Sequence, residues 1–309
     1  MARTFGLAAD RVRSFDVVTG DGVLRRVTPT EHPDLFFALR GGKGTAGIVT
    51  AVEFDLVRLS SFYGGAVYFD GADAAAVIDR WRGWSAHLPE QATTSFVLFR
   101  LPPIPEVPPP LAGRLTLGVR FAWTGDPSEG ARLLDEIRAV APVILDDAAV
   151  KPYTAIDSVH ADPVDPLSVI DPAILLTDFP AEAADRMLEV VGPGSDSTLV
   201  MVEVRQLGGA YAREGRHPAA FDHRAARYSL LVVAMAEDPG ARPRTENLFA
   251  ALTSWDTGGI WPNFGPVHDV TSAQRAYGAQ TLDRLAAVTR KYDPHGVLQA
   301  GRFTRKGIV

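Results

Sequence analysis

Residues 32–50 read HPDLFFALRGGKGTAGIVT, and this stretch predicts a helix, a glycine-rich loop and a strand in that order. Thr30 is placed to cap the helix N-terminus, and Pro33 suits the first turn. We expect the helix over residues 33–39, because the glycine pair that follows favours a helix end. The β-branched run that comes next predicts a strand over residues 48–56.

The glycines of this stretch also spell GxGxxG over residues 42–47, a spacing found in loops that bind dinucleotides. Such a loop follows a strand and opens a helix, because the pyrophosphate is held at the N-terminus of that helix. Here the order is reversed, so we reject a Rossmann site. Two interpretations remain: the glycines permit positive φ between helix and strand, or backbone groups of the loop approach a cofactor closely.

The chain has 309 residues, a net charge of −6, 46% apolar residues and no cysteine. This length fits one large domain or two ordinary ones. The negative charge and the absence of a Lys/Arg-dense block argue against a nucleic-acid partner. The lack of cysteine excludes disulfides, thiolate nucleophiles and cysteine-bound metal centres. The histidines show no metal-binding spacing on one helix, so we expect no metal site.

Nothing in the sequence predicts a membrane segment or a secretion signal. The most apolar run, residues 230–235, is far shorter than a bilayer crossing. The N-terminus lacks the apolar core of a signal peptide. We therefore expect no membrane partner and a cytoplasmic location. The preference for Ala and Arg over Lys suggests a bacterial source.

Strand-like and helical segments mix along the rest of the chain without the strict order of a parallel fold, which indicates an α+β fold. Residues 101–111 contain six prolines and must form an extended loop. The clearest change in character falls near residue 60. Further strands are expected at 66–69, 94–100, 115–123, 198–206 and 228–235, and further helices at 72–84, 129–139, 181–191, 245–255 and 271–292.

One of these strands carries charged residues on a single face. In LVMVEVRQ, residues 199–206, alternation places Glu203 and Arg205 on one face and the valines on the other, toward the core. Two interpretations of the charged face stay open. It is a solvated surface with an ion pair along the strand, or it lines a cleft in which Glu203 acts as a general base with a raised pKa.

Several segments, taken in order, resemble one family of flavin enzymes. They are GLAAD (6–10), DVVTGDG (16–22), HPDLFFALRGG (32–42), GIVT (47–50), EVRQLGGA (203–210), FDHR (221–224), NF (263–264) and KYDPHGVL (291–298). Together they resemble FAD-dependent oxidases of the berberine-bridge type, which are related to vanillyl-alcohol oxidase. The resemblance extends over nearly the whole chain.

The resemblance implies a partial PCMH-type FAD-binding domain plus a substrate domain of antiparallel sheet and flanking helices. Residues 1–59 would be the second part of the FAD-binding domain, residues 60–261 the substrate domain, and residues 262–309 a C-terminal segment that returns to the FAD-binding domain. The implied function is an oxidase that transfers hydride from a small organic substrate to FAD, with Glu203 and Arg205 as catalytic residues. The implied FAD contacts are Gly44, Gly47, Ile48, Val49, Asn263 and Phe264.

The chain also departs from the family pattern. The RGGGHS segment, which holds the pyrophosphate and an FAD attachment site in the family, has no counterpart, and the glycine loop lacks the family's Asn-Phe pair. We therefore expect a fragment of a longer parent, with apolar surface or an unpaired sheet edge exposed on residues 1–59. The alternatives are a flavin-free short homologue, acting as a non-redox enzyme or binding protein, and one half of a split flavoenzyme with a separate flavin-subdomain chain.

Overall fold

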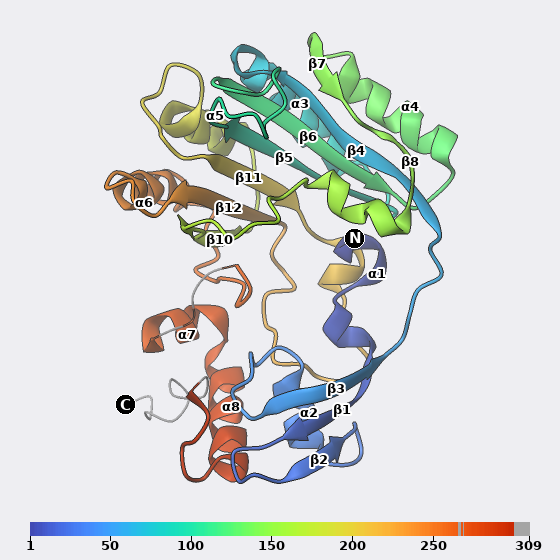
Figure 1. Ribbon diagram of the computed structural model, residues 1–309, viewed down its shortest axis with the longest axis vertical. Helices are drawn as coiled ribbons and strands as arrows, with labels where there is room; N and C mark the ends of the chain where they lie inside the picture. The colour runs from blue at the N-terminus through green and yellow to red at the C-terminus, as the bar shows by residue number, and fades with distance from the viewer. Residues whose placement is uncertain (265–266, 268, 300–309) are drawn as a thin grey trace. The chain divides into compact units, whose positions relative to one another are not determined.

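The structure is a computed structural model, and it describes residues 1–264, 267 and 269–299 (Figure 1). The chain divides into two compact units and passes between them several times. Unit 1 consists of Met1–Thr4, Arg58–Gly209 and Ala225–Thr257, and unit 2 of Phe5–Val57, Ala210–Arg224 and the described part of Gly258–Val309.

Unit 1 is built on one antiparallel sheet. Its strands are β4 (Ser61–Asp70), β5 (Ala92–Arg100), β6 (Leu115–Trp123), β7 (Val143–Asp146), β8 (Ala149–Pro152), β9 (Val169–Ile170), β10 (Ala173–Leu176), β11 (Met201–Gln206) and β12 (Tyr228–Met235). They pair in the order β10-β12-β11-β5-β6-β4-β7, with β8 added beside β4 and β9 beside β12. The central strands are rich in aromatic and β-branched residues, which suit a pleated and half-buried surface.

Four helices cover one face of this sheet (Figure 1). They are α3 (Ala74–Ala86), α4 (Pro127–Arg138), α5 (Ala181–Val191) and α6 (Ala241–Ala251). They bury strand side chains such as Phe96 of β5 and Val204 of β11. The ring of Trp81 in α3 lies 4.9 Å from that of Phe96, and its Nε1 donates a hydrogen bond to Thr94 at 3.0 Å. This side of the sheet is the main core of the protein.

The other face of the sheet is covered by loops and short helical turns instead of long helices. Leu111, from the proline-rich loop, packs with Tyr68 of β4. The 3-10 helix η3 (Tyr153–Val159) packs Val159 against Phe62. Polar side chains of β5, β6 and β11 lie on this face as well, and they form the site described below.

Unit 2 contains a small antiparallel sheet with helices packed against it. Its main elements are β1 (Val12–Val18), β2 (Leu24–Val27), β3 (Ile48–Phe54), α2 (Pro33–Leu39), α7 (Val270–Ala276) and α8 (Ala279–Tyr292), with the sheet order β2-β1-β3. Phe15 and Val17 of β1 are buried in one cluster with Leu35 of α2 and Leu285 of α8. Across the two units, the described residues also form short helical turns: α1 (Ala2–Phe5), η1 (Ala8–Arg11), η2 (Gly71–Asp73) and η4 (Gly209–Ala212).

Two of the family-like motifs contact each other in unit 2. The Asp34 carboxylate of HPDLF accepts hydrogen bonds from Lys291 Nζ at 2.7 Å and from the Tyr292 hydroxyl at 3.0 Å, both in KYDP. Asp293 is 1% exposed, and its carboxylate accepts the backbone N–H of Val297 at 2.8 Å. These motif residues therefore join α2 to α8 and shape the turn after α8.

The structure corrects two local expectations. The N-cap of α2 is His32 instead of Thr30; His32 has a φ of 57° and makes no side-chain cap. The helix expected over residues 271–292 is two helices, because Tyr277 and Gly278 are extended. Asp222 accepts the Gly278 N–H at 2.8 Å and so stabilises the break. The break therefore depends on a residue that pattern alone does not connect to it.

The two units also divide the chain differently from the expected boundaries. Met1–Thr4 belongs to unit 1, because the buried Arg3 guanidinium donates three hydrogen bonds to backbone carbonyls of that unit. Ala210–Arg224 belongs to unit 2, where Arg224 binds the Asp10 carboxylate at 2.6 Å. Each anchor joins residues that are far apart in the sequence.

Candidate functional site

A buried ion cluster lies on the sheet face of unit 1 that the long helices leave free. The strand register places Arg205 of β11, Ser95 of β5 and Arg120 of β6 in one row across the sheet, with Glu203 in the neighbouring row. Residues two apart on a strand point to the same side, so these side chains share one face. The alternation predicted for residues 199–206 is confirmed, since the valines of β11 lie in the helix-side core.

Glu203 is held on both of its carboxylate oxygens. Oε1 accepts hydrogen bonds from Ser95 Oγ at 2.6 Å and from Arg120 Nη1 at 3.0 Å, and Oε2 accepts one from Arg205 Nη2 at 2.7 Å. His160 Nδ1 lies 3.8 Å from Oε1. Glu203 is only 1% exposed. The interpretation of this face as a solvated ion pair is therefore wrong.

The same two arginines keep Glu203 ionised. Burial by itself would raise the pKa of Glu203, but the charges of Arg205 and Arg120 outweigh burial and lower that pKa to about 2. A carboxylate with such a low pKa is a weak base. The raised pKa expected for Glu203 is therefore wrong. The sequence shows Arg205 beside Glu203, but Arg120 is 83 residues away in the chain, and only the sheet brings it near.

The surroundings of the cluster are aromatic. Tyr68 lies in the same cross-strand row as Glu203, and its ring covers Gly118, where an added Cβ would come within 2.8 Å of Tyr68 Cε1. The Arg120 guanidinium lies 5.4 Å from the ring centroid of Phe99. Arg120 Nε is buried and has no hydrogen-bond partner within the part of the chain that the structure describes. Such a donor is uncommon in a folded protein.

His160 joins the cluster from the end of η3, and sequence patterns gave no sign of it. Its carbonyl accepts a hydrogen bond from Arg120 Nη2 at 2.9 Å, and its N–H donates to the Asp157 carbonyl at 3.1 Å. Ala161, the next residue, has a φ of 52°, which is rare for a residue with a Cβ. Burial and the charge of Arg120 lower the pKa of His160 to about 4, so the imidazole is neutral at pH 7.

Some of the residues expected to contact FAD gather in unit 2. Lys43 and Gly44, with φ values of 53° and 73°, form a left-handed turn between α2 and β3. This confirms the positive φ expected for the glycine loop. Lys43 Nζ donates a hydrogen bond to Asn263 Oδ1 at 3.2 Å, although the two residues are 220 positions apart. The structure therefore brings the glycine loop and Asn263 together.

The strand after this loop is open to solvent. Gly47 itself is buried and serves packing, because an added Cβ would come within 2.4 Å of Val17 Cγ2. All of β3 is exposed, and among the described strands β3 pairs only with β1. The apolar surface and the sheet edge expected on residues 1–59 are therefore both present. The exposed apolar side chains are Ile48, Val49, Val52, Phe54 and Leu56.

Asn263 is followed by Phe264, whose ring belongs to a group of tilted aromatic rings. The Phe264 ring lies 5.4 Å from that of Trp261, which lies 5.6 Å from that of Tyr211. Trp261 Nε1 donates to the Tyr211 hydroxyl at 3.0 Å, and burial raises the pKa of Tyr211 to about 12. An apolar strand, an exposed amide and a group of tilted aromatic rings fit the ring end of a flavin. The described residues of unit 2 include no glycine loop that opens a helix, so they do not fit its pyrophosphate equally well.

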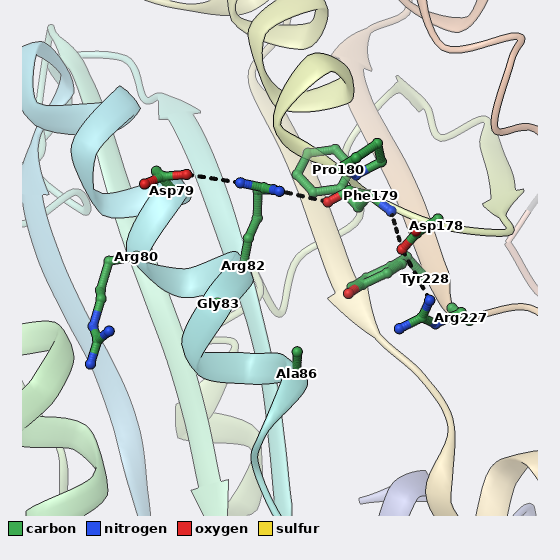
Figure 2. A pocket seen from close by; sticks show the side chains of 10 residues that line it. All are labelled: Asp79, Arg80, Arg82, Gly83, Ala86, Asp178, Phe179, Pro180, Arg227 and Tyr228. Carbon is green, nitrogen blue, oxygen red and sulfur yellow. Dashed lines mark hydrogen bonds and ion pairs between the residues drawn. The ribbon is translucent and has the colours of Figure 1, made fainter.

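A separate pocket of about 530 Å³ lies on the helix-covered side of the unit 1 sheet, between α3 and the segment before α5 (Figure 2). Its charged side chains are paired: Arg82 with Asp79 at 2.8 Å, Arg227 with Asp178 at 3.2 Å, and Arg80 with Glu136, which lies outside the lining. Tyr228 in its lining belongs to the main core. The pocket shares no residue with the Glu203 cluster, and its paired charges do not select a ligand.

Within residues 1–264, 267 and 269–299, no three His, Asp or Glu side chains lie close enough together to hold a metal ion. No helix in these ranges is both long and apolar enough to cross a membrane.

A curated relative matches nearly the full length of the chain. No protein-family model matches the chain. The FAD-linked oxidoreductase sorD of Penicillium rubens is 25% identical over 322 residues, which make up 96% of this chain and 65% of the relative. In other curated relatives, also fungal, the match covers 50–94 residues and only 6–18% of the relative. The chain thus spans less than two thirds of the length of these relatives.

Solved structures match the fold over the whole chain. Physcomitrella patens BBE-like 1 superposes with a TM-score of 0.77 at 19% identity, covering 99% of this chain and 68% of that one. A xylooligosaccharide oxidase from Myceliophthora thermophila, in complex with xylobiose, has a TM-score of 0.76 at 18% identity, covering 100% of this chain and 69% of that one. The chain therefore has the α+β fold of berberine-bridge-enzyme-like FAD oxidases. This confirms the resemblance that the motifs indicated.

Proposed function

We propose that the chain forms the substrate-binding part and the flavin-ring-binding part of an FAD-dependent oxidase that acts on a small organic substrate. The observation that carries this proposal is the fold shared with such oxidases over nearly all of the chain. The similarity to an FAD-linked oxidoreductase over 96% of the chain supports it. Unit 1 supplies a polar cluster on a sheet face, and unit 2 supplies residues that fit a flavin ring.

The proposed cofactor contacts are residues of unit 2. Gly44, Ile48, Val49, Asn263 and Phe264 would hold the flavin ring through backbone groups, apolar surface and an amide. Gly47 contributes by letting β3 pack against β1. When bound, the flavin supplies the hydride acceptor for oxidation of the substrate carbon. The chain itself has to bind the substrate, orient it and take up its proton.

The substrate site follows from unit 1. Arg205 and Glu203 remain the proposed catalytic-site residues, and the geometry suggests their roles. Two guanidinium groups on one carboxylate leave the cluster with a positive charge. The Arg205 side chain is 25% exposed, so it can bind an oxygen or an anionic group of the substrate. Glu203 keeps both guanidinium groups in place.

We also propose that a further polypeptide segment pairs with β3. Soluble proteins rarely leave an apolar edge strand uncovered. A polypeptide segment that adds a strand to β3 and carries a pyrophosphate loop would complete the cofactor site, on the same polypeptide or on a separate flavin-subdomain chain. A cytoplasmic location and a bacterial source stay predictions from composition.

The deciding experiment is the absorption spectrum of the purified 309-residue chain after addition of FAD and removal of free FAD. We expect retained flavin absorbance, weakened by Asn263→Ala and unchanged by Asn247→Ala, which alters an exposed amide on α6. A matched series includes a polypeptide that carries an RGGGHS-type loop, which should tighten binding. A chain that stays colourless with and without this polypeptide would contradict the proposal and favour a flavin-free, non-redox protein.

A further inference from the structure

We infer that His160 is the proton acceptor of the site in unit 1 and that Glu203 positions its imidazole. The inference rests on the proposed function, because it assigns the proton that leaves the substrate. His160 Nδ1 faces Glu203 Oε1 at 3.8 Å. The other ring nitrogen, Nε2, has no hydrogen-bond partner among the residues placed in the structure. At 3.8 Å the two atoms lie beyond hydrogen-bond distance, so the carboxylate acts on the imidazole through its charge, which favours the tautomer with the proton on Nδ1 and leaves Nε2 to accept a proton.

The side chains of His160 and Glu203 differ in their exposure to solvent. The His160 side chain is 33% exposed and the Glu203 side chain 2%. The Glu203 carboxylate already accepts hydrogen bonds from Ser95, Arg120 and Arg205. A substrate hydroxyl can therefore reach the imidazole more easily than the carboxylate.

The backbone around His160 fixes this arrangement. Arg120 Nη1 binds Glu203, while Arg120 Nη2 binds the carbonyl of His160 at 2.9 Å. One buried guanidinium therefore ties the imidazole-bearing residue to the carboxylate. The N–H groups of His160 and Ala161 both donate to the Asp157 carbonyl, at 3.1 and 2.9 Å. The left-handed φ of Ala161 is a local strain of the kind that is found at functional sites.

The relative basicity of the two groups agrees with this geometry. The pKa of His160, about 4, stays above that of Glu203, about 2, so the neutral imidazole is the stronger base of the two. Burial, Arg120 and Arg205 disfavour the imidazolium, while Glu203 and Asp162 favour it. Once His160 has taken a proton, its new charge lies beside the Glu203 carboxylate, which stabilises it.

When a substrate alcohol is oxidised, one proton and one hydride leave it. The O–H proton moves to His160 Nε2 as the carbonyl bond forms. The carbon-bound hydrogen would leave with its electron pair to the hydride acceptor that a bound flavin would supply. His160, whose side chain is 33% exposed, then releases its proton to solvent, and the imidazole is neutral again.

The first test is an NMR pH titration of the histidine imidazoles in the full chain, with His160 assigned through His160→Gln. We expect a neutral imidazole protonated at Nδ1 at pH 7, with a pKa well below the usual 6.5. Glu203→Gln should lower the pKa of His160 further, because it removes a stabilising negative charge. Ser95→Ala keeps the carboxylate and should leave a smaller change. A pKa near 6.5 that does not respond to Glu203→Gln overturns the inference.

The second test measures flavin reduction by substrate in the FAD-loaded protein, with xylobiose and simple alcohols as probes. His160→Gln should retain FAD and slow reduction by about 100-fold or more, the usual contribution of a general base. His87→Gln, at an exposed histidine that ends α3, should leave the rate unchanged. An unchanged rate in His160→Gln overturns the inference. If the wild-type protein retains no FAD either alone or with the RGGGHS-type polypeptide, or if the loaded protein is reduced by no probe, the proposed function fails instead, and the titration alone decides the His160–Glu203 pair.

Discussion

Neutralising Glu203 should be costly, and the structure allows the cost to be worked out. The change Glu203→Gln keeps the size of the side chain and removes its charge, which leaves the guanidinium groups of Arg120 and Arg205 without a counter-ion. The pKa of Glu203 falls from 4.5 to about 2 in the folded protein, a difference of about 2.5. At about 1.4 kcal/mol per pKa unit, this corresponds to about 3 kcal/mol of stability at pH 7. Breaking a buried ion pair costs a similar amount, about 3–5 kcal/mol.

The assay is urea unfolding of wild type and Glu203→Gln at a series of pH values. Because the folded pKa is lowered, the stabilisation is fully present above pH 4.5 and is lost as the pH falls toward 2. The difference between the two proteins should therefore be about 3 kcal/mol at pH 7 and should shrink steadily below pH 4.5. Glu182→Gln is the matched control, because Glu182 is 64% exposed and pairs with Arg186 at the surface. It should change stability by only about 0.5 kcal/mol.

Two results would refute this reasoning. One is a loss below about 1 kcal/mol at pH 7, which would mean that the arginines do not depend on Glu203 for their charge balance. The other is a difference that does not vary with pH between 4.5 and 2. The second result would mean that the cost arises from packing or from lost hydrogen bonds, and that the charge of Glu203 contributes little.

Two further predictions concern glycine packing and the open strand. Gly47→Ala should lower the free energy of unfolding by about 1–3 kcal/mol, because the new Cβ would lie 2.4 Å from Val17 Cγ2. Gly83 lies inside α3, and a Cβ added there would meet no atom within 4 Å, so Gly83→Ala should raise the free energy of unfolding by about 0.5–1 kcal/mol in the same urea assay. If the two substitutions changed this free energy equally, the space around Gly47 would not be limiting. The double variant Val52→Lys, Phe54→Lys on β3 should leave the melting temperature nearly unchanged and reduce self-association, measured by light scattering. The control Thr50→Lys removes no apolar surface and should reduce self-association less. A large loss of melting temperature in the double variant would show that β3 is covered.

Local pattern predicted much of the secondary structure. The helix over residues 33–39 agrees with the structure at both ends, because proline, a run of apolar residues and paired glycines mark its limits within a few positions. The charged face of β11 could be predicted as well, since alternation is a property of one strand. The break at Gly278 could not, because it depends on Asp222, which comes from a distant segment.

The sequence by itself determined the class of fold, the reversed order around the GxGxxG motif and the sidedness of Glu203 and Arg205. These features depend on residues near one another in the chain. Tertiary structure alone decided the charge state and neighbours of Glu203, because Arg120 and His160 reach it only when β6 and η3 pack beside β11. It also decided that HPDLF and KYDP bind each other and that Gly47 serves packing. The physical reason is that pKa values and ion pairs depend on distance in space, which separation along the chain does not give.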